Sequence, residues 1–223
     1  MKNEKILEML NAGQYQELRE KLADEIYTEK IKEKPDAKKR YAAMKRFYKY
    51  IPSGVPEWCM APKRDVTRTV LQEEVHENCF CSRYGVVFTS EDIGTIKDFN
   101  TLYPDKTYPD VNRLIPNVYG DIDTFNIETI LAEAKSRGYK YAKKEVLAEK
   151  PTYFWNYRDA YYSIGLLDQL YSIVVDGIPA GLHYVNSKSM LTIATTIGTC
   201  GILPVRMTEE LKSQKIIIRG KEE

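Results

Sequence analysis

The chain has 223 residues, of which 43% are hydrophobic and 29% charged, and its formal net charge is +1. This composition is ordinary for a globular protein with one sizeable core and excludes a fibrous or low-complexity chain. No apolar run approaches the roughly 20 residues of a membrane span, and the charged first residues do not resemble a secretory signal, so we expect a cytoplasmic protein.

Residues 3–34 predict helices that are interrupted at the segment Asn11-Ala-Gly13. Apolar residues recur at helical spacing along one side, while Glu and Lys alternate on the other. We expect a helical extension whose apolar stripe is buried either on its own domain or on a neighbouring chain. The stripe consists of Ile6, Leu10, Leu18, Leu22 and Ile26.

A short basic helix is predicted next, with Asp36 as its N-cap and its end before residue 51. Its apolar side predicts contact with a core, and its remaining surface is positively charged. The basic residues are Lys38, Lys39, Lys45, Arg46 and Lys49. For any single one, a solvated helix face is the plainest interpretation.

From residue 56 to about residue 95 the pattern is typical of β-strands, including one at 57–60, so this stretch and the helix before it predict an αβββ unit. Cys79 and Cys81 lie in one strand-like run, where alternation points both thiols to the same face. Together with Cys59 and His76 they could form a zinc site, but their spacing lacks the usual gaps between ligand pairs. Buried reduced thiols fit better, and we expect no metal and no cofactor.

Residues 97–117, rich in Pro, Asp and Tyr, predict a linker. A strand at 122–125 then leads to a helix from Ile127 to about Tyr141, with Asn126 as its cap. Ile127, Ile130, Leu131 and Ala134 form its expected buried stripe. A second basic cluster follows the helix and contains Lys135, Arg137, Lys140 and Lys143.

After a strand at 152–155, the last part of the chain predicts a strand at residues 161–163, an amphipathic helix to about Val175 and three strands at 181–185, 190–194 and 201–205. This is a βαβββ unit. The charged tail after Met207 contains Ile216-Ile-Ile218, which predicts either an edge strand or a contact with a neighbour.

The sequence contains no recognisable catalytic motif. Its two histidines, His76 and His183, are isolated in β runs, and it has no Gly-x-Ser-x-Gly, phosphate-binding glycine loop or His-Glu-x-x-His. Asp121, Asp123 and Glu128 could form a carboxylate cluster, but acids also gather at helix starts. We therefore predict a protein that is not an enzyme. The seventeen tyrosines suit interfaces, because a phenol packs its ring and hydrogen-bonds at its tip.

Three segments resemble a known family. The closing unit ends in Leu203-Pro-Val-Arg-Met207, the linker contains Tyr108-Pro-Asp-Val-Asn-Arg-Leu-Ile-Pro116, and Thr67-Arg-Thr-Val-Leu-Gln72 precedes Cys81-Ser-Arg-Tyr-Gly85. In this order they resemble segments of the bacterial DNA polymerase III beta subunit, the sliding clamp. Thr69 stands where the family has proline, and Arg83-Tyr84 stand near its Asp-Gly.

The resemblance implies an α+β fold of DNA-clamp-like βαβββ repeats, with antiparallel sheets and helices on one face, preceded by the N-terminal helical extension. The expected parts are the extension at 1–35, a clamp-like domain at 36–207 and a tail at 208–223. The domain would hold units at about 36–96 and 121–207, joined by the linker 97–120.

The resemblance also implies a function: a short phage-like or mobile-element-like processivity factor for DNA replication. The basic helix faces would contact duplex DNA without reading its sequence, and a homo-oligomer would be needed for a ring, because the chain is short for a clamp. The segment Pro204, Val205, Arg206 and Met207 would belong to a groove for the peptide of a polymerase or another replication protein. The alternatives are an oligomeric scaffold or inhibitor that binds a polymerase or host clamp without encircling DNA, and an enzyme using a carboxylate or Cys79 and Cys81.

Overall fold

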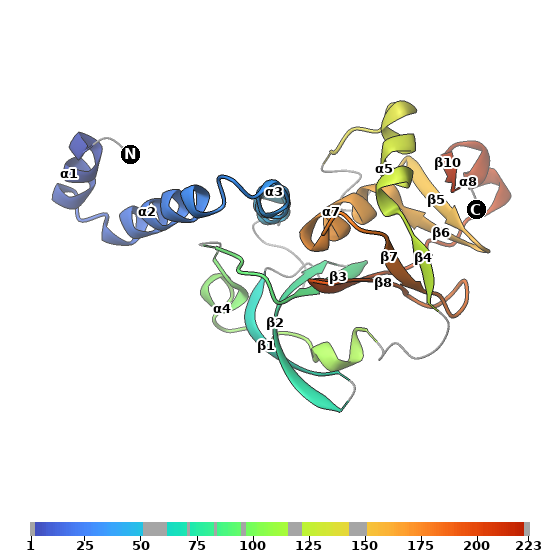
Figure 1. Cartoon of the computed structure of the whole chain (residues 1–223), viewed down its shortest axis with the longest axis horizontal. Helices are drawn as coiled ribbons and strands as arrows, with labels where there is room; N and C mark the ends of the chain where they lie inside the picture. The colour runs from blue at the N-terminus through green and yellow to red at the C-terminus, as the bar shows by residue number, and fades with distance from the viewer. Residues whose placement is uncertain are drawn as a thin grey trace.

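The structure is a computed structural model. It describes residues 3–50, 62–70, 72–82, 84–94, 97–115, 122–142 and 151–220, apart from the side chains of residues 3 and 47–50. It is a mixed α+β fold, as expected (Figure 1). No helix within these ranges is both long and apolar enough to cross a membrane.

Helices and strands alternate along the chain. The helices are α1 (Asn3–Asn11), α2 (Tyr15–Lys30), α3 (Pro35–Tyr50), α4 (Phe99–Leu102), the 3-10 helix η1 (Val111–Arg113), α5 (Ile127–Ser136), α7 (Ile164–Val174) and α8 (Glu209–Ser213). The strands are β1 (Lys63–Val70), β2 (Glu73–Ser82), β3 (Gly85–Thr89), β4 (Asp123–Phe125), β5 (Tyr153–Tyr157), β6 (Ala160–Ser163), β7 (Ala180–His183), β8 (Leu191–Thr195), β9 (Gly198–Ile202) and β10 (Ile216–Arg219).

The strands of the described residues form two sheets. The larger sheet has seven strands in the order β1-β2-β3-β9-β8-β7-β4, and all of its neighbouring pairs are antiparallel. The smaller sheet has the order β10-β5-β6, with β10 parallel to β5 and β6 antiparallel to it. The C-terminal tail therefore contributes an edge strand, one of the two roles that its isoleucines predicted.

Helix α7 is the centre of the fold. The Ser163 hydroxyl caps its start by accepting a hydrogen bond from the Leu166 backbone N–H. Its expected apolar residues are all buried, and so are Asp168 and Gln169 on its other sides. Every residue of α7 except Ser172 is buried, so other elements must cover nearly all of its surface. Helix α7 contacts β3 and β9 of the large sheet, β5 and β6 of the small sheet, and helices α3 and α5 (Figure 1).

Two glycines allow α7 to lie close against the large sheet. A Cβ at Gly85 on β3 would collide with Leu170, and one at Gly198 on β9 would collide with Val174 and with the Phe88 carbonyl. A side chain at either position would thus displace side chains of α7 and press on the backbone of a neighbouring strand.

The opposite face of the sheet carries a smaller core. Val66, Cys79, Cys81 and Phe88 are buried there with Val111 of η1, while Phe80 of β2 points to the main core around α7. Cys79 and Cys81 are both buried on one face as free thiols, which confirms the prediction from strand alternation.

The N-terminal helices form an arm that extends away from the sheets (Figure 1). Helix α2 is held to the body where the Tyr27 hydroxyl donates to the Asp92 carbonyl at 3.0 Å and the Tyr27 ring packs on that of Tyr41 at 4.7 Å. Of the predicted stripe, Leu18 is buried, but Leu10 and Ile26 are 39% and 69% exposed. The prediction that Leu10 and Ile26 are buried against their own domain is therefore wrong.

Several predicted boundaries are corrected. Helix α5 ends at Ser136 instead of near residue 141, because Gly138 adopts a positive φ of 92° and the Tyr139 N–H bonds back to the Ala134 carbonyl. Helix α3 begins at Pro35, which places Asp36 in the first turn and not at the cap. The last strand of the closing unit is 198–202 instead of 201–205. The strand predicted at 57–60 lies outside the described residues.

Because Leu170 is fully buried between α7 and the sheet, Leu170→Ala should lower the free energy of unfolding by about 2–5 kcal/mol. Ile178→Ala, at a residue that is 51% exposed and lies outside the arm, is the control and should change it by no more than about 0.5 kcal/mol. Urea denaturation followed by circular dichroism measures both. Equal effects of the two substitutions would contradict the central position of α7.

Candidate nucleic-acid interface

The two basic segments predicted from the sequence meet at one groove of about 540 Å³. Lys39 and Arg46 line it from α3, and Lys135 lines it from the end of α5. We call this the basic groove and define it by Lys39, Arg46, Lys135, Tyr141, Asp168 and Ser172. Residues far apart in the chain thus form a single concavity, in which the three cations lie with the carboxylates of Glu128 and Asp168.

The position of the groove follows from the packing of α3 and α5 on α7. The inner side of α3 buries Ala37, Tyr41 and Met44, and α5 buries its predicted stripe, confirming that pattern. Both helices contact α7. Their apolar faces are turned inward, so the basic side chains at their edges lie on either side of a floor made by α7.

The cations of the groove have few strong partners within the described residues. The Lys39 ammonium lies 3.7 Å from an Asp36 oxygen and 4.0 Å from a Glu128 oxygen, and all three side chains are exposed, so these pairs are weak. Lys135 forms no ion pair with the residues that the structure describes. Both lysines can therefore exchange solvent for an anion at small cost.

Arg46 stacks on an aromatic ring at the end of the groove. Its guanidinium carbon lies 4.8 Å from the centre of the Tyr141 ring, a cation–π contact. Its Nε is buried and has no hydrogen-bond acceptor among the described residues. The guanidinium and the ring together form one wall of the groove, and the Arg46 Nε–H is a donor without an acceptor among the described residues.

The floor of the groove contains a buried carboxylate. Asp168 is 7% exposed and accepts hydrogen bonds from the Tyr139 hydroxyl at 3.1 Å and the Ser172 hydroxyl at 3.3 Å. Buried charges require such partners. The negative floor also offsets the mutual repulsion of the three cations above it.

The other predicted DNA-binding residues fall into three groups. Lys38 and Lys140 are exposed and do not line the groove. Lys45 and Arg137 have closer partners within the fold: Lys45 pairs with Asp24 of the arm at 2.8 Å, and Arg137 pairs with Glu133 at 2.6 Å and donates to the Ile217 carbonyl at 3.3 Å. The side chain of Lys49 and all of Lys143 lie outside the described residues.

The predicted partner-peptide segment follows β9 without regular structure. The Leu203 N–H donates to the Tyr84 carbonyl at 2.8 Å and the Val205 N–H to the Tyr161 carbonyl at 2.7 Å. The basic groove and the groove beside β4 are both lined by residues other than Pro204, Val205, Arg206 and Met207. The chain then continues through α8 to β10, which pairs with β5 instead of lying over this segment.

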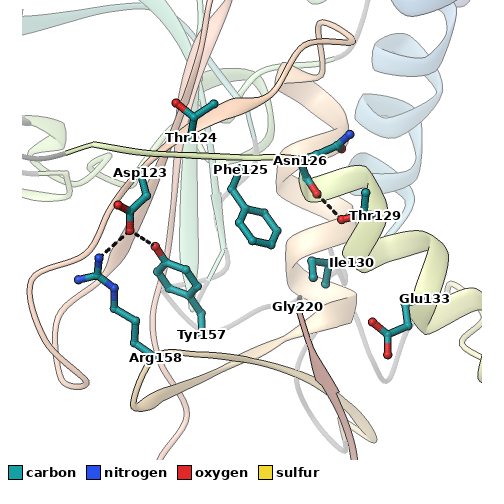
Figure 2. A pocket seen from close by; sticks show the side chains of 10 residues that line it. All are labelled: Asp123, Thr124, Phe125, Asn126, Thr129, Ile130, Glu133, Tyr157, Arg158 and Gly220. Carbon is teal, nitrogen blue, oxygen red and sulfur yellow. Dashed lines mark hydrogen bonds and ion pairs between the residues drawn. The ribbon is translucent and has the colours of Figure 1, made fainter. Parts of the chain in front are cut away.

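A second groove, of about 620 Å³, lies beside β4, between the start of α5 and the β5–β6 turn (Figure 2). We call it the β4 groove. At one end Asp123 accepts hydrogen bonds from the Tyr157 hydroxyl at 2.5 Å and from Arg158 at 2.6 Å, while Phe125 and Ile130 form its apolar part. Asp123 therefore lies in this groove and Glu128 in the basic one, so the predicted carboxylate cluster does not form between them. Asp121 is outside the described residues.

The contacts of Asp123 alter two pKa values. The hydrogen bond from Tyr157, together with Arg158, lowers the pKa of the Asp123 carboxyl. Burial, and then the hydrogen bond to Asp123, raise the pKa of the Tyr157 phenol to about 12. At neutral pH the carboxylate is charged and the phenol is protonated. This ionisation pattern stabilises the contact but supplies no proton donor or acceptor that titrates near neutral pH.

Within the described residues, no group of three or more His, Cys, Asp and Glu side chains could hold a metal ion. Comparison with protein-family models, with curated proteins and with solved structures finds no match to this chain.

Asp123→Asn should lower the pKa of Tyr157 from about 12 toward the ordinary value of about 10, because the substitution removes the negative charge that disfavours the phenolate. NMR titration of ¹³C-labelled tyrosine measures this pKa. Asp110→Asn, at an exposed acid of η1, is the control and should leave it unchanged. An unchanged pKa of Tyr157 in the Asp123→Asn variant would contradict the contact.

Proposed function

We propose that the chain is a sliding-clamp-like protein that associates with duplex DNA through the basic groove and tethers a replication polymerase. The observation that carries this proposal is the convergence of Lys39, Arg46 and Lys135 on one concave surface. Lysine and arginine side chains attract phosphates without reading bases, which permits movement along the duplex.

The order of the elements supports the clamp-like part of the proposal. The segment α3-β1-β2-β3 and the segment α7-β7-β8-β9 each place three antiparallel strands after a helix. Their last strands, β3 and β9, pair with each other, and their helices, α3 and α7, are in contact. Two similar units joined edge to edge agree with the repeat that the sequence resemblance implies.

A second candidate function, an oligomeric scaffold that does not encircle DNA, is favoured by the arm. Leu7 and Ile26 are 59% and 69% exposed, and Tyr15 is 61% exposed. Several large apolar side chains exposed on one extension are typical of a protein–protein contact. The same contact would serve a ring, so assembly and DNA binding need separate tests.

Lys39→Ala and Lys135→Ala should each weaken the binding of blunt duplex DNA and reduce the slope of log affinity against log salt by up to about 0.9. Fluorescence anisotropy over a salt series measures both quantities. Arg113→Ala removes one positive charge from η1, away from the groove, and is the matched control. A loss of affinity in the control as large as in the groove variants would mean that only net charge matters.

A double substitution, Leu7→Asp with Ile26→Asp, should reduce the solution mass of the protein if the arm joins chains, because each change places a charge in the apolar contact. Light scattering over a concentration series measures the mass. Wild-type protein that is monomeric at every concentration would exclude self-assembled encirclement. An oligomer that the double variant leaves intact would place the contact elsewhere.

A further inference from the structure

The basic groove has features that binding to a phosphate backbone does not require. A duplex presents phosphates on a convex surface, and exposed lysines alone suffice to attract it. This groove is concave, with a volume of about 540 Å³, inside the range of about 300–1,000 Å³ that is usual for small-ligand sites. It also holds an aromatic wall and a buried carboxylate, neither of which binds phosphate.

The wall formed by Arg46 and Tyr141 suits a nucleobase. Bases that are not paired stack on tyrosine rings and on the planes of arginine guanidinium groups. Because the two planar groups are already in contact at 4.8 Å, they are ordered before a base arrives. The Arg46 Nε is buried without an acceptor among the described residues.

The floor decides which part of a nucleotide enters the groove. Asp168 repels phosphate, so a phosphate is held at the rim, where Lys39 and Lys135 lie. A carboxylate has about four acceptor positions, and the hydroxyls of Tyr139 and Ser172 use two of them. The remaining capacity can accept a hydrogen bond from an amino group on the edge of a base.

We propose that the basic groove binds one unpaired nucleotide, with its phosphate between Lys39 and Lys135, its base against Arg46 and Tyr141 and the edge of the base toward Asp168. A base inside a duplex is paired and stacked and does not reach such a floor. The preferred ligand is therefore duplex DNA that carries a single-stranded end. This inference rests on the proposed function and gives it a specific substrate.

The test compares three DNAs of equal duplex length with the wild-type protein, using fluorescence anisotropy at low salt. One is blunt, one has a short single-stranded overhang and one has an overhang of the same length made of abasic sites. The abasic overhang has the same charge but no bases. We expect the natural overhang to bind about fivefold or more tightly than the abasic one, as expected for stacking of one base.

A pair of variants places the effect in the groove. Tyr141→Ala should remove the preference for the natural overhang over the abasic one, whereas Tyr141→Phe should keep the preference because it keeps the ring. Circular dichroism tests whether both variants are folded. If Tyr141→Ala does not fold, the comparison of the three DNAs with the wild-type protein still tests the inference.

The possible results separate this inference from the proposed function. Equal binding of all three DNAs would overturn the inference while the proposed function stands. Tight binding of the abasic overhang, equal to that of the natural one, would also overturn it, because charge alone would then explain the affinity. If none of the DNAs binds, the proposed function fails and the inference fails with it.

Discussion

The burial of α7, in which every residue but Ser172 is buried, is the constraint on which the rest of the structure depends. Leu166, Leu167, Leu170, Ile173 and Val174 form one apolar stripe of this helix. Asp168 and Gln169 on its other sides are buried as well, so other elements enclose the helix. Gly85 and Gly198 allow the large sheet to approach it closely from below. Helices α3 and α5 cover other parts of its surface. Their basic edges are brought together as a consequence of covering α7, without any direct contact being required between the two basic segments.

The charges near the groove divide into those that hold the fold and those that remain for a ligand. Lys45 ties the arm to α3 through Asp24, and Arg137 ties α5 to the C-terminal strand. Lys39 has only weak exposed pairs, and Lys135 has no ion pair among the described residues. Beneath these two lysines, Asp168 is held by two hydroxyls. A negative floor under a positive rim orients a ligand that has a negative charge at one end and hydrogen-bond donors at the other. A nucleotide has both features.

Local features of the fold could be predicted from the sequence, because caps and helical periodicity depend on neighbouring residues. Asn126 caps α5, the segment 164–174 is the central helix, and Ile216–Ile218 form an edge strand. The pairing of β3 with β9 could not be predicted, since it joins distant segments and leaves no local signal. The two basic clusters could be recognised in the sequence. The ion pairs that Lys45 and Arg137 form within the fold could not. Tyr141 and Asp168 were missed as site residues because only packing brings them to the groove. The one available signal for Asp168 was that it is the single acidic residue of a mostly apolar helix.

The most direct measurement of the central claim is an NMR titration of backbone and lysine side-chain resonances with duplex DNA at low salt. If α3 and α5 present their basic edges to phosphates over α7, the largest shifts will occur at Lys39, Arg46 and Lys135, with little change in the β1–β2 hairpin. Shifts centred on another surface, or shifts spread evenly over all exposed lysines and arginines, would contradict the account.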